Sequence, residues 1–272
     1  MVKDFKQEFY KLLGLVKSRE PFAFSRFSDG EVTILRGKHL ELGRGFFIQH
    51  DIHGERKVRV SPDTYNEEEQ KKFDPLTDKW LQDRLTEAFK HRQHNYFKGI
   101  PAQNALDGGK SWKFCKDLYG DGDDEHLSFS NVMINDNYKL FVKEMIPEFK
   151  GEKVIIVCNK NSKLDGLPFR IEAAALIGSN CMINDINLIE ILKSRIAQDL
   201  YKDRIFLFAA STLSNLLCYE LYKEFPQNQY IDIGSSLGPY MGLSGWMPTR
   251  TYLNRYWANP NNPPPQEVDI WQ

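Results

Sequence analysis

The sequence contains few cysteines, and no two of them form a Cys-x-x-Cys pair. Its 272 residues include four, and these are Cys115, Cys158, Cys181 and Cys218. A disulfide framework or a zinc site would need closer and more regular spacing. We therefore predict four reduced, structural thiols in a cytoplasmic protein.

Long apolar runs and a dominant charge are also absent. No 18 consecutive residues are apolar, so the sequence predicts no membrane-spanning helix. Residues 1–17 mix Lys, Asp and Glu with apolar residues at helical spacing, and we expect no signal peptide there. The 36 Lys and Arg residues nearly balance 37 Asp and Glu, leaving a net charge of −1. This balance argues against a protein that coats nucleic acid through bulk charge, but it allows a local basic groove.

Aromatic residues are abundant, at 13% of the chain. The simplest interpretation is an aromatic core. The alternative is that some of the rings line a groove in which sugars or bases stack.

The pattern of apolar runs predicts an α/β fold. Lys153–Cys158 and Arg204–Ala209 are continuous apolar runs of the kind found in strands that are buried on both faces. Helical periods alternate with such runs, which predicts a mainly parallel, Rossmann-like sheet flanked by helices. We expect one such domain over residues 1–245. Residues 246–272 form an irregular, proline-rich tail that packs on the domain or extends from it.

Prolines guide two further assignments. Pro75 follows Asp74 and suits the first position of a helix. Pro168 likewise predicts a helix that runs through Leu176, and Asn180–Ile183 is predicted as a strand.

The first group of candidate site residues is Arg26-Phe-Ser-Asp29-Gly-Glu31, where a predicted strand ends. Ligands bind at the carboxyl ends of strands in open α/β sheets. Asp29 and Glu31 could offer hard oxygen ligands to one Mg²⁺ or Mn²⁺ ion that is shared with a diphosphate. Arg26 would add a fork suited to phosphate. The alternative is an ordinary helix start, with Asp29 as the N-cap and Glu31 facing the helix dipole.

The second group is Ala209–Asn215, which follows a buried strand and opens a helix. Small residues there would let a phosphate approach the N–H groups at the helix N-terminus. Simple capping by Ser211 or Thr212 is the alternative. The segment is no Walker loop, since it lacks Gly-Lys-Ser/Thr.

The third group follows the strand that contains Asp232, and Gly234 and Ser235 begin a tight polar turn there. Gly234–Gly238 also matches the G-x-S-x-G pattern of a nucleophile elbow. A hydrolase of that type needs its histidine after the serine, and all six histidines come before it. We therefore reject the hydrolase interpretation.

Together these segments resemble the GT-D-type glycosyltransferases. Their RFGDGE signature is similar to FAFSRFSDGEVTIL here, and their nucleotide-side segment and IDIG strand are similar to FAASTLSNLLCYELYKEF and YIDIGSS. Intermediate motifs resemble NYFKGIP and SFSNVMINDNYKLF. The resemblance extends over residues 22–242.

The resemblance implies a single α/β domain that transfers a sugar from a nucleotide donor, usually a UDP-sugar, with Mn²⁺ or Mg²⁺. Asp29 and Glu31 would hold the metal directly or through water. Asp232 would bind ribose hydroxyls or act as general base toward the acceptor. The remaining candidates for donor or substrate binding are Arg26, Asn135, Asn137, Asn159, Ser211, Thr212, Gly234 and Ser235.

Three positions depart from the family pattern. Ser28 stands where the family usually has Gly, and Ala210 where many members have a Gly-Pro pair. Gly238 stands where we expect Asp, which removes a carboxylate. The departures at Ser28 and Gly238 support an alternative of a different class, a non-catalytic nucleotide-binding or scaffold protein with a degenerate site.

The acceptor implied by the resemblance is a glycan or a glycoprotein. A hydroxylated DNA base is a second candidate, because residues 36–60 carry excess positive charge and the tail contains Trp246, Arg250, Tyr252, Arg255, Tyr256 and Trp257. The sequence leaves a homo-oligomer open.

Overall fold

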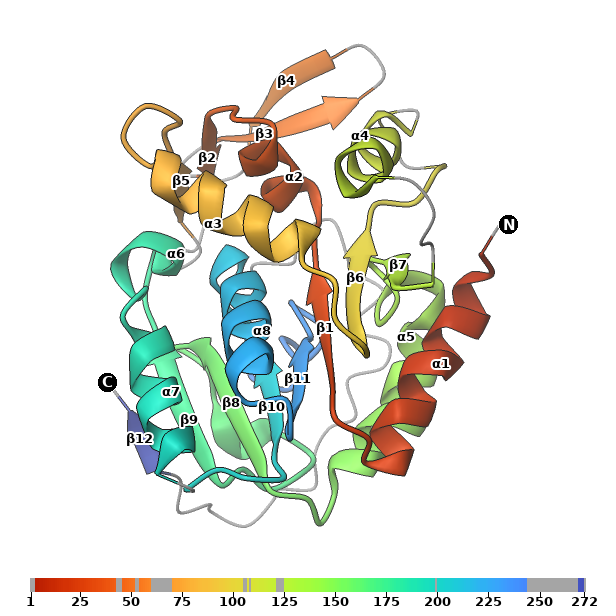
Figure 1. The fold of residues 1–272 in the computed structure, drawn as a ribbon, viewed down its shortest axis with the longest axis vertical. Coiled ribbons are helices and arrows are strands. Elements are labelled where there is room, and N and C mark those ends of the chain that lie inside the picture. The colour runs from red at the N-terminus through yellow and green to blue at the C-terminus, as the bar shows by residue number, and fades with distance from the viewer. Residues whose placement is uncertain are drawn as a thin grey trace.

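The chain forms one large parallel sheet covered by helices on both faces (Figure 1). The computed structural model describes residues 3–42, 46–51, 54–59, 70–104, 107, 109–120, 125–198, 200–243 and 269–271. The main sheet has eight strands, and every neighbouring pair is parallel. The predicted parallel α/β architecture is therefore confirmed.

The main sheet is ordered β12-β9-β8-β10-β11-β1-β6-β7. In this order its strands are Asp269–Trp271, Ala173–Ile177, Val154–Asn159, Ile205–Phe208, Gln229–Asp232, Phe22–Arg26, Tyr96–Ile100 and Leu127–Phe129. Two antiparallel pairs lie outside this sheet. They are β2 (Leu40–Leu42) with β5 (Lys71–Phe73), and β3 (Phe46–Asp51) with β4 (Gly54–Arg59).

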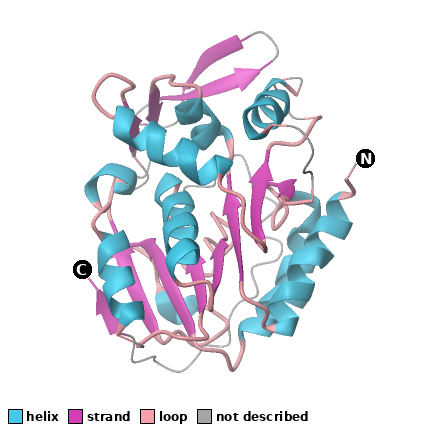
Figure 2. Ribbon diagram, viewed as in Figure 1, coloured by secondary structure: helices cyan, strands magenta, loops and turns pink. Residues whose placement is uncertain are grey.

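Helices occupy both faces of the sheet, as the cyan segments of Figure 2 show. The α-helices are α1 (Phe5–Ser18), α2 (Asp29–Leu35), α3 (Lys79–Lys90), α4 (Lys110–Tyr119), α5 (Tyr138–Leu140), α6 (Cys181–Asn184), α7 (Leu188–Ala197) and α8 (Thr212–Glu224). A π-helical turn (Phe141–Met145) extends α5. Short 3₁₀ turns lie at Asn135–Asn137, Ile146–Phe149 and Leu164–Gly166.

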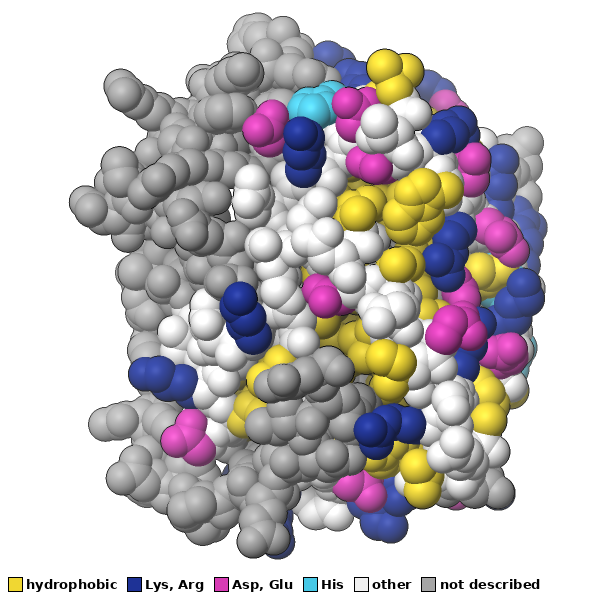
Figure 3. Space-filling view, turned by 90° about the vertical axis from the view of Figure 1, so that its left-hand side faces the viewer, with side chains coloured by type: hydrophobic (Ala, Val, Ile, Leu, Met, Phe, Trp, Pro, Cys, Tyr) yellow, Lys and Arg dark blue, Asp and Glu magenta, His cyan; other side chains and the backbone are white. Residues whose placement is uncertain are grey.

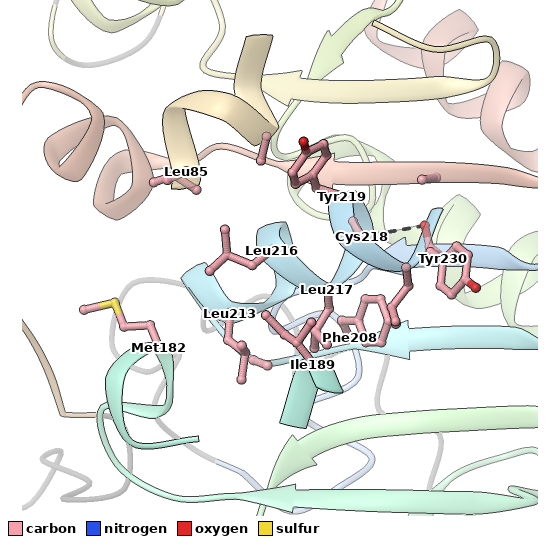
Figure 4. Close-up of a cluster of buried hydrophobic side chains, with 14 of the residues drawn as sticks. Leu85, Met182, Ile189, Phe208, Leu213, Leu216, Leu217, Cys218, Tyr219 and Tyr230 are labelled. Atoms are coloured by element: carbon pink, nitrogen blue, oxygen red, sulfur yellow. Dashed lines mark hydrogen bonds between the residues drawn. The ribbon is translucent and has the colours of Figure 1, made fainter. Parts of the chain in front are cut away.

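The hydrophobic core consists of two layers, one on each face of the sheet. Successive side chains of a strand point to opposite faces, so Ala23 of β1 joins one layer while Phe22 and Phe24 join the other. Helices α3, α7 and α8 cover the first layer, and α1 and α5 the second. Figure 4 shows the first layer, where Leu217 of α8 lies beside Phe208 of the sheet.

Two predicted elements between β8 and α7 are exchanged in the structure. The predicted helix from Pro168 to Leu176 is wrong, because residues 173–177 form β9, which pairs with β8. The predicted strand Asn180–Ile183 is wrong as well, because α6 begins at Cys181. Alanine favours helices in isolation. Ala173, Ala174 and Ala175 are nevertheless buried in the sheet, so the tertiary context overrides that preference.

The helix predicted to begin at Pro75 starts four residues later, at Lys79. The intervening residues form a turn held by two aspartates. Asp78 Oδ2 accepts a hydrogen bond from Asp74 N at 2.8 Å, and Asp74 Oδ1 accepts one from Leu76 N at 2.9 Å. Side-chain bonds of this kind compete with the first turn of a helix and delay it.

All four cysteines are free and buried, as predicted for structural thiols. Burial raises the pKa of Cys115 to about 12 and that of Cys158 to about 11, so these thiols stay protonated near neutral pH. Among the described residues, no helix has the length and apolar character needed to span a membrane. Of the tail, residues 269–271 form β12, and 246–268 lie outside the described residues.

Candidate active site

Apart from three asparagines, the predicted site residues lie where the order of strands in the sheet reverses. From β1 the chain continues outward through β6 and β7, and it then returns to β8 on the other side. Strands β1 and β11 are direct neighbours at this point. Crevices at such a reversal, outside the carboxyl ends of the strands, are the usual ligand sites of open α/β sheets.

Glu31 links the start of α2 to the start of α8. Its side chain is buried, and Oε2 accepts a hydrogen bond from Ser28 N at 3.0 Å. The other oxygen, Oε1, accepts one from Thr212 Oγ1 at 3.0 Å. A Glu at this position satisfies an N–H group that the helix start would otherwise leave unpaired. The N-cap is therefore Ser28 rather than Asp29, and Glu31 bridges two segments that are far apart in the sequence.

Asp232 and Arg26 form a second buried contact, at the ends of β11 and β1. Asp232 Oδ2 accepts a hydrogen bond from Arg26 N at 3.1 Å, and Oδ1 accepts one from Gly234 N at 3.0 Å. The Arg26 guanidinium Nη1 lies 3.9 Å from Oδ1, and both side chains are less than a tenth exposed. Burial raises the pKa of Asp232 to about 7, against the opposing effect of Arg26 and with a further rise from Glu31. This carboxyl can therefore exchange a proton near neutral pH.

Gly234 leaves space for the Arg26 side chain. Its φ is +51°, and a Cβ atom there would lie 1.5 Å from Arg26 Nη1. On its other side, Arg26 Nε donates a hydrogen bond to the carbonyl oxygen of Ser130, in the segment after β7. The guanidinium is thus held between the turn after β11 and the segment after β7.

The start of α8 is suited to an anion. Ser211 precedes this 13-residue helix with a φ of +52°, a conformation that residues other than glycine seldom adopt. Within the described residues, its Oγ is buried and has no hydrogen-bond partner. Ser214 Oγ accepts a hydrogen bond from Ala210 N at 2.9 Å, which holds the preceding loop. An unpaired hydroxyl beside the N–H groups of a long helix could bind phosphate.

Asp29 and Glu31 could hold a divalent metal only together with a ligand. Asp29 is exposed in the first turn of α2, and each oxygen of Glu31 accepts one hydrogen bond and retains a lone pair. The part of the chain that the structure describes has no group of three His, Cys, Asp or Glu side chains that could hold a metal ion. This donor set fits an ion that is shared with a diphosphate, not one enclosed by protein alone.

The three candidate asparagines lie outside this cluster. Asn137 is buried, and its Nδ2 donates to Phe5 O at 2.8 Å, which fastens α1 to the rest of the domain. Asn159 Oδ1 accepts from Asn161 N at 2.9 Å, and its strand β8 is separated from β1 by β10 and β11. Asn135 lines a neighbouring cavity.

Ser235 is placed in the turn after β11, where its carbonyl oxygen accepts a hydrogen bond from Gly238 N at 3.0 Å. It directly follows Gly234 and is partly exposed. The candidates that the structure brings into direct contact are therefore Arg26, Glu31, Thr212, Asp232 and Gly234.

Asn215 ends the predicted Ala209–Asn215 group without being a candidate for binding or catalysis, and it is fully buried in α8. Its Nδ2 donates to Arg26 O at 2.9 Å and to Ser25 Oγ at 3.0 Å, so it fixes the end of β1. Its position three residues after Thr212 places both on one face of the helix. A polar residue within a largely apolar helix was the signal that could have identified it.

Comparison with known proteins shows the fold. No family model and no curated protein matches the chain. A solved structure of domain of unknown function 1792 (DUF1792) does match, with a TM-score of 0.55 and 14% identity, over 98% of this chain and 94% of the other. The chain has the same fold.

Two further structures agree with this result. One is described as a new glycosyltransferase (DUF1792) from Streptococcus sanguinis, with a TM-score of 0.53 and 14% identity over 99% of this chain and 94% of that one. The other, reported to show that DUF1792 has a distinct glycosyltransferase fold, has a TM-score of 0.53 and 15% identity over 98% and 94%. The glycosyltransferase fold implied by the sequence motifs is therefore confirmed.

Proposed function

We propose that this protein is a glycosyltransferase that moves a sugar from a nucleotide-sugar, most simply a UDP-sugar, to an acceptor hydroxyl. The observation that carries the proposal is the meeting of two buried contacts, Arg26–Asp232 and Glu31–Thr212, at the strand-order reversal. Solved proteins with this fold include one described as a glycosyltransferase.

The donor diphosphate would bind between Arg26 and the start of α8. The Arg26 guanidinium supplies positive charge, and the unpaired Ser211 Oγ and the first N–H groups of α8 supply hydrogen bonds. Thr212 is held in place by its bond to Glu31. These groups would bind the leaving diphosphate most tightly as its negative charge grows, which is when stabilisation accelerates transfer.

A Mn²⁺ or Mg²⁺ ion would be held by Asp29, and by Glu31 directly or through water. When bound, such an ion would neutralise charge on the diphosphate. The exposed carboxylate of Asp29 suits an ion that arrives with the nucleotide.

Asp232 would accept the proton from the acceptor hydroxyl. A general base works best when its pKa lies near the working pH, and burial raises the pKa of Asp232 to about 7. The N–H groups of Arg26 and Gly234 each bond one of its oxygens, so the carboxylate is held in one orientation.

A carbohydrate acceptor is favoured over DNA. On the face shown in Figure 3, the described Lys and Arg side chains are interspersed with Asp and Glu. This face therefore does not create the positive field that tracks a phosphate backbone. The aromatic and basic tail residues proposed for DNA binding, from Trp246 to Trp257, lie outside the described residues.

A thermal-shift panel of nucleotides and UDP-sugars, with Mn²⁺, Mg²⁺ or EDTA, tests the donor proposal. We expect metal-dependent stabilisation by UDP or one UDP-sugar, because a ligand that binds the folded state raises its melting temperature. Asp29→Ala should abolish the metal dependence, whereas the control Asp83→Ala, at an exposed aspartate of α3, should retain it. Binding without turnover of any donor would favour the scaffold alternative, and no binding at all would sink the donor site.

A further inference from the structure

We infer that a cavity beside the Arg26–Asp232 contact binds the carbohydrate acceptor. This inference rests on the proposed function as a glycosyltransferase. The cavity has a volume of about 910 Å³ and lies at the carboxyl ends of β6 and β7. It is closed by the start of α1 and by α4, which lie on the same side of the molecule in Figure 1. Its volume lies within the range of small-molecule sites.

The cavity is adjacent to the Arg26–Asp232 contact. Ser128 and Asn131 line it, and Ser130, between them, accepts the hydrogen bond from Arg26 Nε. Ser130 N in turn donates to Ile100 O at 2.9 Å, and Ile100 also lines the cavity. The cavity wall and the contact with Arg26 therefore share the backbone segment of residues 128–131.

Two buried polar atoms in the cavity wall lack partners. Ser128 Oγ and Asn131 Oδ1 make no hydrogen bond within the described residues, and Ser128 is 4% exposed. A buried polar group without a partner costs stability, and native proteins seldom retain one without a reason. Both atoms are covered in this structure, so a ligand hydroxyl could bond them after a change of side-chain rotamer that brings them to the cavity surface.

The rest of the wall combines aromatic and amide side chains with three charged ones, Lys3, Lys116 and Asp136. Trp112, Phe5 and Phe129 provide flat apolar surface, and Gln103 and Asn104 provide neutral hydrogen-bonding groups at the exposed rim. A pyranose ring has an apolar face and a periphery of hydroxyls, so it matches aromatic rings combined with neutral amides. The charge in the cavity is mixed, since Lys3 is paired with Glu8 and Asp136 accompanies Lys116, whereas a donor diphosphate would need concentrated positive charge of the kind that Arg26 supplies.

The test measures carbohydrate binding and UDP binding separately. Saturation-transfer NMR would use methyl β-glucoside, methyl β-galactoside, cellobiose and lactose as probes, with the full-length protein. The variants are Ser128→Ala and Asn131→Leu, and the control is Trp80→Ala, at a half-exposed tryptophan of α3 that does not line the cavity. Both variants remove an unpaired atom, so their melting temperatures should equal or exceed that of the wild type.

We expect at least one probe to bind the wild type, with affinity lowered about tenfold in each cavity variant and unchanged in the control. No binding of any probe, or equal binding by the wild type and both cavity variants, would overturn the inference. The metal-dependent thermal shift with UDP should stay unchanged in both cavity variants. If UDP binds and no carbohydrate does, the cavity assignment is wrong and the proposed function is unaffected. If carbohydrates bind and UDP does not, the proposed function is wrong, and the cavity loses its role as an acceptor site.

Discussion

Replacement of Asp232 by asparagine tests whether burial holds this carboxyl in a protonated state up to neutral pH. Its pKa is raised from 3.8 to about 7 in the folded protein. The folded state therefore keeps a proton that the unfolded chain has already released. Stability from this proton is fully present below about pH 4 and is lost as the pH rises through 7.

The size of the effect follows from the shift. Each pH unit between 5 and 7 costs about 1.4 kcal/mol of stability, so the wild type should lose about 3 kcal/mol between pH 5 and pH 8 through this group. The side-chain amide of the Asp232→Asn variant would be neutral throughout and would remove this loss. That amide can accept only one of the two N–H groups, from Arg26 or Gly234, that the carboxylate accepts. The mismatch costs about 1–3 kcal/mol at every pH.

Urea denaturation of both proteins at pH 5 and pH 8 separates the two effects. The mismatch shifts the stability of Asp232→Asn equally at both pH values, and other titrating groups are common to both proteins. Between pH 5 and pH 8, the free energy of unfolding of the wild type should therefore fall by about 3 kcal/mol more than that of Asp232→Asn. Parallel losses of stability would refute the raised pKa. If Asp232 is also the general base, the rate of sugar transfer by the wild type should rise with pH through about 7. The rate of the Asp232→Asn variant should be about 10²–10⁴ times lower.

Three further substitutions test the contacts of the cluster. Gly234→Ala places a Cβ atom 1.5 Å from Arg26 Nη1. We therefore expect the free energy of unfolding, measured by heat or urea, to fall by about 1–3 kcal/mol, and donor turnover to be lost. Normal turnover would show that the position of the guanidinium is not needed. Thr212→Val keeps the shape but leaves Glu31 Oε1 without its partner, and should cost about 1–3 kcal/mol by the same measurement. Glu31→Ala should cost a similar amount, because the Thr212 hydroxyl loses its acceptor, and should abolish metal-dependent turnover in a donor-hydrolysis assay; full activity there would contradict the metal assignment.

Local residue patterns were enough to predict the fold class and most of the sheet. The apolar run at residues 153–158 is β8, shifted by one residue, and the run at 204–209 contains β10. Both strands are buried on two faces, so their composition alone identifies them. The segment from Arg26 to Glu31 was also readable, because a strand end, a glycine and two carboxylates are local features.

Tertiary context determined the segments where local signals conflict with packing. Residues 173–177 contain three alanines and favour a helix in isolation, but they pair with β8 and become a strand. Asn137 and Asn159 were plausible ligands from their position near strand ends. Only the structure shows that their side chains bond to Phe5 and Asn161.

The properties that make the cluster a candidate active site come from contacts between distant segments. Arg26 and Asp232 are 206 positions apart in the sequence, and Glu31 and Thr212 are 181 apart. The pKa of Asp232 rises because its side chain is buried, and no local pattern encodes that burial. The cavity lined by Ser128 and Asn131 likewise forms only when α1 and α4 close over the ends of β6 and β7. The sequence by itself thus determined the strands and the polar residues at their ends. Only the tertiary structure decided which of these residues contact one another and how burial shifts the pKa of Asp232.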